Sequence, residues 1–190
     1  MTQLYLALVH HPIVNKRGEL ITTSVTNMDI HDIARSCRTF GFENYFIVTP
    51  LKPQQELISR ILGHWNSDLA NDYNPDRQSA LSYIRVVDDL DQAIGQIEQR
   101  GNGRPLLAVT AAQMKQIDGG TQQLREMAQV DNRPLLLILG TGWGLHPQVL
   151  ERADFRLKPI YGSAQDGYNH LSVRSAAALY CGALSEESLF

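Results

Sequence analysis

Three short runs of apolar residues constrain the fold of this chain more than any other feature. Residues 4–9, 106–109 and 135–139 are hydrophobic at every position, without alternation of polar and apolar side chains. Strands of this kind are buried on both faces, as in a parallel sheet that helices cover on each side. Segments with helical spacing of apolar residues separate these runs along the chain. The sequence therefore predicts an α/β fold with a mostly parallel sheet of about six strands and helices on both faces.

The remaining elements follow from shorter patterns. Polar, poorly patterned stretches at 15–27 and 66–78 predict loops, the second with one helical turn. No linker or low-complexity tract separates the elements, so we expect residues 1–190 to form a single domain. Further strands are expected at 45–48, 83–87 and 155–160, and helices at 29–40, 53–64, 89–100, 121–130, 146–153 and 171–184.

The composition is that of an ordinary globular protein with a slight excess of acidic residues. The net charge is -3, from 17 lysines and arginines against 20 aspartates and glutamates. No global basic field attracts nucleic acid, although a local basic patch would be enough to bind it. No apolar run approaches the roughly 20 residues of a membrane span and no leader pattern is present, so we expect a cytoplasmic protein without membrane contact.

Cysteine and histidine residues predict no metal site. Cys37 and Cys181 lack the spacing of metal ligands, and so do the six histidines. We expect both cysteines to be reduced thiols, as is usual in the cytoplasm.

Two loops near the C-terminus predict a ligand site. The first, Gly140-Thr141-Gly142-Trp143-Gly144, follows an apolar run, and the second, 166–170, precedes the last helix. Loops at the carboxyl ends of neighbouring strands are the usual place for ligands in open α/β sheets. We expect Gly142 to let the backbone approach such a ligand closely. The first loop is neither a dinucleotide fingerprint nor a P-loop, because it lies late in the chain and no Gly-Lys-Ser/Thr follows it.

The sequences of residues 139–145, LGTGWGL, and 168–178, YNHLSVRSAAA, resemble the two C-terminal motifs of the SPOUT superfamily of S-adenosylmethionine-dependent RNA methyltransferases. The resemblance covers nearly the whole chain and is greatest to a small bacterial branch often encoded near the tRNA guanine-N1 methyltransferase. It implies a C-terminal deep trefoil knot, S-adenosylmethionine bound among the knot loops, RNA as the partner, and a homodimer whose interface completes the active sites. Periodicity alone would not predict a knot, because knots are nearly absent among protein folds.

Residues 32–41, DIARSCRTFG, are similar to the first motif of the ribose 2′-O branch of this superfamily. In both, an arginine stands six residues before a glycine, here Arg35 and Gly41. The branch prefers asparagine where this chain has Asp29, and it has a glutamate where this chain has Thr141-Gly142-Trp143. The resemblance therefore leaves open whether the ribose 2′-O or a base is methylated.

The resemblance also implies roles for individual residues. Arg35, Asn169 and Arg174 are the implied catalytic residues. An arginine orients a phosphate or polarises the target more readily than it acts as a base, because its pKa exceeds ~12. The alternative for Arg35 is a surface cation, and that for Arg174, in the unfavourable first turn of a helix, is a salt bridge to another helix. The residues implied in cofactor binding are Thr110, Leu139, Gly140, Thr141, Gly142, Gly144, Ile160, Gly162, Tyr168, Asn169, Leu171 and Ser172.

Several side chains in this region have structural alternatives. Thr110 could simply end a strand, and Ser172 could cap the last helix. Trp143 offers a face on which a base could stack, or it is buried in a dimer interface. His170 either titrates near neutrality or is held by packing. A further cluster, which either contacts RNA or forms a solvated loop, is His10, His11, Lys16 and Arg17.

We therefore expect an S-adenosylmethionine-dependent RNA methyltransferase that acts on tRNA or rRNA. The alternative is a non-catalytic RNA-binding or regulatory module that retains the cofactor pocket, which the acidic net charge and the missing glutamate favour. The intact 169–178 motif and Arg35 favour the enzyme. A third alternative is a nucleotide-dependent enzyme with ordinary doubly wound topology.

Overall fold

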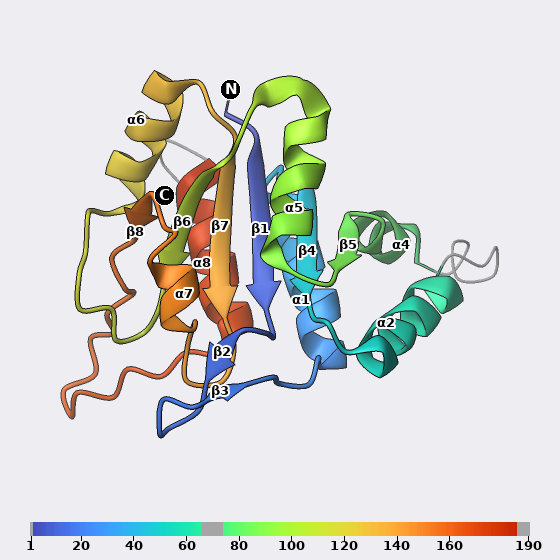
Figure 1. Cartoon of the computed structure of the whole chain (residues 1–190), viewed down its shortest axis with the longest axis horizontal. Coiled ribbons are helices and arrows are strands. Elements are labelled where there is room, and N and C mark those ends of the chain that lie inside the picture. Colours follow the sequence, from blue (N-terminus) through green and yellow to red (C-terminus); the bar gives the residue numbers. More distant parts are fainter. Residues whose placement is uncertain (1, 66–73, 186–190) are drawn as a thin grey trace.

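A six-stranded sheet runs through the middle of the molecule in the computed structural model, which describes residues 2–65 and 74–185 (Figure 1). The strand order is β5-β4-β1-β7-β6-β8, and every neighbouring pair is parallel. The predicted α/β fold with six parallel strands is therefore confirmed. The strands are β1 (Leu4–Val9), β4 (Asn44–Val48), β5 (Ile84–Val87), β6 (Leu106–Thr110), β7 (Leu135–Gly140) and β8 (Phe155–Arg156).

Helices cover both faces of this sheet. They are α1 (Asn27–Thr39), α2 (Lys52–Trp65), α4 (Pro75–Leu81), α5 (Leu90–Ile97), α6 (Thr121–Asp131), α7 (Pro147–Leu150) and α8 (Val173–Ser185), and a π-helical turn, η1 (Glu98–Asn102), follows α5. Apolar residues of α1, α2, α4, α6 and α8 share one core with the sheet, and those of α5 and α7 share the other. The molecule therefore has three layers, with α5 and α7 in front of the sheet and α1 and α8 behind it in Figure 1.

The central strand β1 shows why its sequence does not alternate. Leu6 and Leu8 point into the core beneath α1 and α8, whereas Tyr5 and Ala7 point into the core beneath α5. Every residue of β1 is buried, so each position favours an apolar side chain whichever face it occupies.

The last strand is shorter than predicted. β8 ends at Arg156 instead of continuing to residue 160. Leu157 still donates its amide to the carbonyl of Val109 at 2.8 Å, but Pro159 has no amide hydrogen with which to extend the ladder. The chain then follows an irregular path past the carboxyl edge of the sheet before α8 begins at Val173 (Figure 1). The trefoil knot expected around this connection stays a prediction.

The prediction of a loop over the polar stretch 15–27 was incomplete. It contributes to a small antiparallel hairpin formed by β2 (Ile13–Val14) and β3 (Leu20–Ile21). Strands of two residues are too short to produce a periodic pattern, so the sequence contained no basis for predicting them. This hairpin lies below the carboxyl ends of β1 and β7 in Figure 1 and forms one wall of the site described below.

Two helical predictions and one loop prediction also need correction. α7 spans four residues instead of the predicted 146–153. The helix predicted over 89–100 is α-helical only to Ile97 and continues as η1, where Gly101 has φ +91°. Within the predicted loop 66–78, residues 66–73 lie outside the described residues, and α4 begins at Pro75, where the side chain of Asn74 accepts the amide of Arg77.

The two cysteines lie where α1 meets α8. Cys37 and Cys181 are both buried and free. Burial raises the pKa of the Cys37 thiol well above its ordinary value, and a hydrogen bond with Cys181 raises it further. Over residues 2–65 and 74–185, none of the helices has both the length and the apolar character needed to cross a bilayer.

Candidate functional site

The carboxyl ends of β7, β6 and β8 lie next to one another and bring three loops together. Thr110 ends β6 opposite Leu139, and Gly140 ends β7 opposite Val9 of the central strand. The segment 161–171, which follows β8, is exposed at every residue. Most of the residues predicted to bind the cofactor therefore lie on adjacent strand ends and the loops that leave them. Those on the strands, such as Leu139, are buried, and those on the last loop are not.

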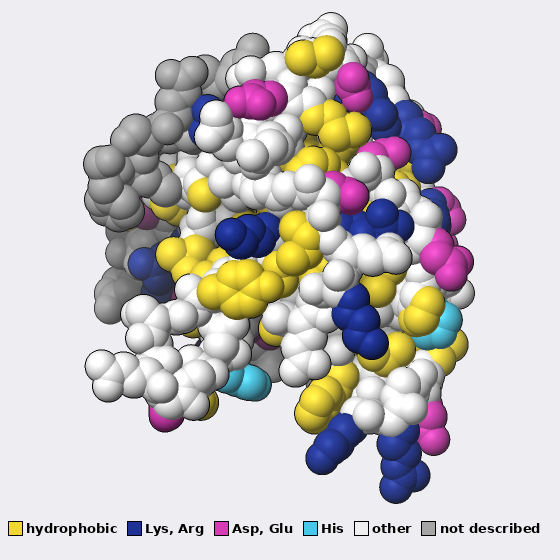
Figure 2. Space-filling model, turned by 90° about the vertical axis from the view of Figure 1, so that its left-hand side faces the viewer, with side chains coloured by type: hydrophobic (Ala, Val, Ile, Leu, Met, Phe, Trp, Pro, Cys, Tyr) yellow, Lys and Arg dark blue, Asp and Glu magenta, His cyan; other side chains and the backbone are white. Residues whose placement is uncertain are grey.

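Large apolar side chains project from this last loop. Tyr161, Tyr168 and Leu171 are 61%, 67% and 45% exposed. Figure 2 views the molecule from the side on which the loop lies and shows hydrophobic side chains at the surface among several lysines and arginines. Large apolar side chains exposed together on one loop often meet a ligand or a partner. Flat apolar side chains beside a sheet edge fit an aromatic base, so the residues present fit the adenine group of a nucleoside cofactor.

The glycine loop after β7 is held by the β2–β3 hairpin. Trp143 donates its amide to the carbonyl of Val14 at 3.2 Å, and Val14 donates its own to the carbonyl of Gly144 at 3.0 Å. Gly142 has φ +59°, and a Cβ there would lie 3.1 Å from Cδ1 of Ile13. Hairpin side chains thus fill the space that a Cβ at Gly142 would occupy, and the expected close approach of its backbone to a ligand stays a prediction. The glycine is required by packing within the protein.

Thr141 anchors the same loop through a chain of side-chain hydrogen bonds. Its hydroxyl donates to the carbonyl of Val9 at 3.1 Å and lies 2.5 Å from the hydroxyl of Thr23. A hydroxyl has one hydrogen, so Thr23 donates to Thr141 and therefore accepts from Nδ1 of His10 at 3.0 Å. His10 is fully buried, and this desolvation lowers its pKa to about 4, so the ring is neutral. His10 is thus a structural residue of this wall, so neither alternative for its cluster, contact with RNA or a solvated loop, describes it.

Thr110 docks the last helix against the end of β6. The hydroxyl of Tyr180 donates to the carbonyl of Lys158 at 2.9 Å, so it accepts the hydroxyl of Thr110, also at 2.9 Å. Burial raises the pKa of Tyr180, which keeps the phenol protonated for this role. The hydroxyl of Thr110 is therefore engaged inside the protein while its backbone ends β6 at the site.

Asn169 closes the loop 160–169 from within. Its Oδ1 accepts the amide of Gly162 at 2.9 Å, and its Nδ2 donates to the carbonyl of Ile160 at 3.0 Å. Both ends of the side-chain amide are thereby occupied. The geometry favours a positioning role for Asn169, which shapes the loop, over direct action on a substrate.

Ser172 caps the last helix, as the structural alternative proposed. Its Oγ accepts the amide of Ser175 at 3.1 Å and lies 2.9 Å from the Ser175 hydroxyl. A side-chain oxygen in this place satisfies an amide that has no partner within the helix.

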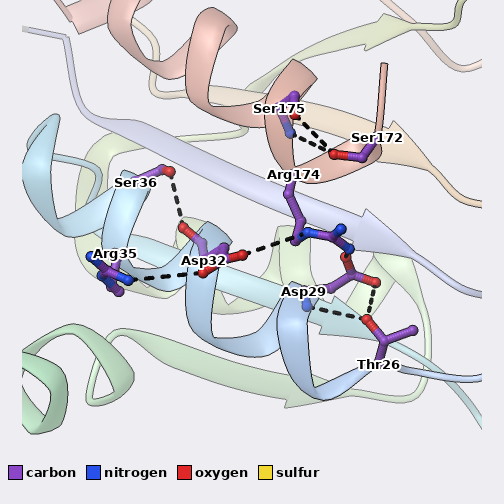
Figure 3. Close-up of polar contacts among 8 residues, drawn as sticks. All are labelled: Thr26, Asp29, Asp32, Arg35, Ser36, Ser172, Arg174 and Ser175. Atoms are coloured by element: carbon purple, nitrogen blue, oxygen red, sulfur yellow. Dashed lines mark hydrogen bonds and ion pairs between the residues drawn. The ribbon is translucent and has the colours of Figure 1, made fainter. Parts of the chain in front are cut away.

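Arg174 joins α8 to α1 (Figure 3). Its Nη1 lies 2.9 Å from Oδ1 of Asp29, and its Nε lies 3.5 Å from Oδ2 of Asp32. Asp29 is buried and also accepts the hydroxyl of Thr26, the N-cap of α1, at 2.6 Å. These carboxylates explain a cation in the first turn of a helix, so the alternative of a salt bridge to another helix is confirmed. Asp29 and Asp32 stand three residues apart on α1, and that spacing places both carboxylates toward one neighbour.

Arg35 lies on the opposite side of Asp32 from Arg174 (Figure 3). Its Nη1 is 3.9 Å from Oδ1 of Asp32, and its side chain is 62% exposed. Among the described residues, Asp32 is the carboxylate paired with Arg35, and this ion pair does not reach the loops after β7 and β8. The structure therefore does not bring Arg35 together with Asn169 within one copy of the chain.

The other side chains singled out from the sequence lie at or near the surface. Trp143 is 64% exposed, and Nζ of Lys16 lies 5.9 Å from its ring centroid. The exposed ring of His170 lies 6.5 Å from that of Tyr168. Nδ1 of His11 is hydrogen-bonded to the Thr22 hydroxyl at 3.0 Å. In the described part of the chain, no cluster of histidine, cysteine, aspartate or glutamate could hold a metal ion.

Comparison with known proteins decides the family. The model of a family described as SAM-dependent RNA methyltransferase matches residues 3–185. The chain belongs to this family. S-adenosylmethionine is thus the cofactor of the family, and the resemblance noted in the C-terminal motifs is confirmed.

Members and relatives of the family differ in length. A tRNA (guanine-N(1)-)-methyltransferase of Oleidesulfovibrio alaskensis is 47% identical over 176 residues, which are 93% of this chain and 40% of that protein. An uncharacterized protein of Aquifex aeolicus is 38% identical over 176 residues, 93% of this chain and 85% of that protein. The chain thus spans less than half the length of the relative whose name states an activity.

Solved structures share the fold at low sequence identity. A probable methyltransferase from Bordetella pertussis superimposes with a TM-score of 0.62 at 16% identity, covering 97% of this chain and 95% of that chain. The SpoU methyltransferase AviRb from Streptomyces viridochromogenes, in complex with AdoMet, gives 0.55 at 17% identity, covering 96% and 57%. The fold is that of the SPOUT methyltransferases.

Proposed function

We propose that this chain transfers a methyl group from S-adenosylmethionine to an RNA, either tRNA or rRNA. The observation that carries the proposal is the exposed loop 161–171 beside the glycine loop, in a chain that belongs to an RNA methyltransferase family. The tRNA relatives support tRNA as the substrate, although their names describe proteins more than twice as long as the matched segment. Experiment has to decide whether the acceptor atom is the ribose 2′-O or an atom of a base.

The carboxyl edge would hold the cofactor between apolar side chains. Leu139, Ile160 and Leu171 would form the slot for the adenine, and backbone groups near Gly162 and Tyr168 would complete it. Bound S-adenosylmethionine supplies an electrophilic methyl group carried on a sulfonium. The protein then needs to orient the acceptor in line and to exclude water, and it requires no covalent intermediate.

Arg35 would orient the RNA. A guanidinium keeps its charge at any physiological pH and forms paired hydrogen bonds to phosphate, so it positions a phosphate instead of removing a proton. Because Arg35 lies away from the loops of its own chain, a homodimer in which Arg35 faces the partner's loops fits the geometry. The exposed Tyr161, Tyr168 and Leu179 are apolar surface that such a dimer could cover.

Calorimetric titration with S-adenosylmethionine and S-adenosylhomocysteine tests cofactor binding first, and labelled methyl transfer to total RNA then tests catalysis. Binding near micromolar with transfer supports the enzyme. Binding without transfer to any RNA fraction would favour the non-catalytic module, which the family match does not favour. Arg35→Ala should abolish transfer while cofactor affinity stays within about threefold, a change below ~0.7 kcal/mol. Loss of cofactor binding in that variant would contradict the assigned role.

A further inference from the structure

A groove on the surface formed by α1, α2 and α4 lies outside the cofactor loops. Its volume is about 550 Å³, and a hollow of about 310 Å³ adjoins it. Arg35 and Asp32 line both. The groove therefore leads to the arginine that we propose acts on the RNA.

The charge of the groove is opposite to that of the chain. Among the described residues that line it, Arg35, Arg60 and Arg77 stand with a single carboxylate, Asp32, which also pairs with Arg174. Within residues 2–65 and 74–185, no carboxylate lies within ion-pair distance of Arg60 or Arg77. A positive groove on a chain with a net charge of -3 attracts a polyanion locally, although the molecule as a whole does not.

Apolar side chains stand between these cations. Met28 is 59% exposed, and Ile61 and Trp65 complete the apolar wall. The guanidinium of Arg77 lies 4.8 Å from the ring centroid of Trp65, which holds that cation at the groove. Cations alternating with apolar and aromatic surface are how proteins bind single-stranded nucleic acid, because the cations meet phosphates and the apolar surface meets bases.

His31 adds an unsatisfied polar group to the wall of the groove. Its Nδ1 is buried and, among the described residues, has no hydrogen-bond partner. The ring meets Trp65 edge-on, with the centroids 5.8 Å apart. A buried nitrogen without a partner costs free energy, and because protein atoms cover it, a ligand in the groove reaches it only if the wall moves.

We propose that the groove between α1, α2 and α4 binds a single-stranded stretch of the RNA substrate. Arg60 and Arg77 contact phosphates, and Met28, Ile61 and Trp65 contact bases. The identification of the ligand as RNA rests on the proposed function. Within one copy of the chain the groove is separate from the loops after β7 and β8, so RNA docking and cofactor binding can be measured independently.

The test compares the salt dependence of RNA binding in matched variants of the full chain. The probe is a short fluorescent single-stranded RNA of mixed sequence, titrated by anisotropy at several salt concentrations. Arg60→Gln is the main variant, because Arg60 is exposed and its loss should not disturb folding. Arg104→Gln is the matched control, since Arg104 is also exposed but precedes β6 at the amino end of the sheet.

We expect Arg60→Gln to weaken RNA binding severalfold and to make the slope of log K against log salt shallower by about 0.7, the loss of one phosphate contact to a single strand. Arg77→Gln should act in the same direction, Arg104→Gln should keep the wild-type slope, and S-adenosylmethionine affinity should be unchanged in all three.

Wild-type RNA affinity and slope in both Arg60→Gln and Arg77→Gln would overturn the groove proposal and leave the proposed function intact. A dimer that sedimentation shows to dissociate in Arg60→Gln would assign the groove to a second copy of the chain and would also overturn the proposal. A wild-type protein that binds neither RNA nor S-adenosylmethionine would contradict the proposed function itself, and the groove proposal with it.

Discussion

The ion pair that joins α8 to α1 permits a quantitative test of what holds this fold together. Arg174 meets Asp29 at 2.9 Å, and the Asp29 side chain is only 7% exposed. Arg174→Met keeps the apolar stem but leaves a buried carboxylate without its cation. Asp29→Asn keeps the shape and removes the charge. We therefore expect Arg174→Met to be the more destabilising of the two changes.

The degree of burial sets the size of the effect. Removing one partner from a fully buried ion pair costs about 3–5 kcal/mol. The Arg174 side chain is 27% exposed, and Asp32 provides a second carboxylate at 3.5 Å, so solvent and Asp32 reduce the penalty. We expect the free energy of unfolding to fall by about 3 kcal/mol in Arg174→Met and by about 2 kcal/mol in Asp29→Asn. For a chain of this length these losses lower the melting temperature by roughly 7 and 5 °C.

The double variant separates the ion pair from other effects. With Asn at position 29 no buried charge remains, so Arg174→Met costs little more, and the double variant should lose about 3 kcal/mol instead of the additive 5. Urea denaturation of the four proteins measures this coupling. Arg35→Met is the control, because its pair with Asp32 is exposed at 3.9 Å and should contribute less than about 0.5 kcal/mol.

Two results would refute this reasoning. If the losses of the single variants simply add, the carboxylate and the guanidinium do not stabilise one another. If Arg174→Met is as stable as the wild type but cannot transfer methyl groups, Arg174 has the catalytic role that the sequence first implied.

Three further predictions concern the walls of the site. Burial lowers the pKa of His10 to about 4, so the unfolded chain, in which a histidine titrates near ~6.5, takes up its proton first as the pH falls. The stabilisation that the neutral His10 provides is complete above pH ~6.5, and it falls by about 2–3 kcal/mol by pH ~4.5. Urea denaturation should therefore show that the stability of His10→Asn depends less on pH than that of the wild type. An equal pH dependence would contradict the assignment of His10 as a buried neutral residue. Gly142→Ala should lower the free energy of unfolding by about 1–2 kcal/mol, because Gly142 has a φ of +59° and an added Cβ would contact Ile13. Gly63→Ala in α2 should instead raise the free energy of unfolding by about 0.5–1 kcal/mol. If both substitutions change the stability in the same direction, the packing described around Gly142 is wrong. Asn169→Ala removes both hydrogen bonds that close the loop 160–169 and should weaken S-adenosylmethionine binding about tenfold by calorimetry, with less than about 1 kcal/mol lost in stability. Unchanged affinity with loss of methyl transfer would instead show a catalytic role for Asn169.

Features that depend on neighbours in the sequence were predicted well. The apolar runs identified the strands because burial on both faces acts on each residue of a run separately. Where a strand was wrong, as at 155–160, one residue was the reason: Pro159 cannot extend the ladder. The β2–β3 hairpin was missed because two-residue strands carry no period.

Most of the residues that the sequence predicted for the site lie on strand ends and loops at one edge of the sheet, and their part in cofactor binding stays a prediction. The motif positions put Thr110, Gly140 and Asn169 at one edge of the sheet, as the order of strands requires. Which hydrogen bonds they form depends on residues distant in the chain, such as Thr23, which is 118 residues from Thr141. No local pattern records that the hairpin occupies the space beside Gly142.

By itself, the sequence determined the layer architecture and the family, because periodicity, caps and motifs are properties of contiguous residues. Only the tertiary structure decided that Arg174 pairs with Asp29, 145 residues away, and that Arg35 lines a groove instead of meeting the loops after β7 and β8 of its own chain. These outcomes depend on how α1 and α8 pack on the same face of the sheet. A charge in an exposed helix turn looks the same in the sequence whether or not a carboxylate from another helix reaches it, and folding alone makes the difference.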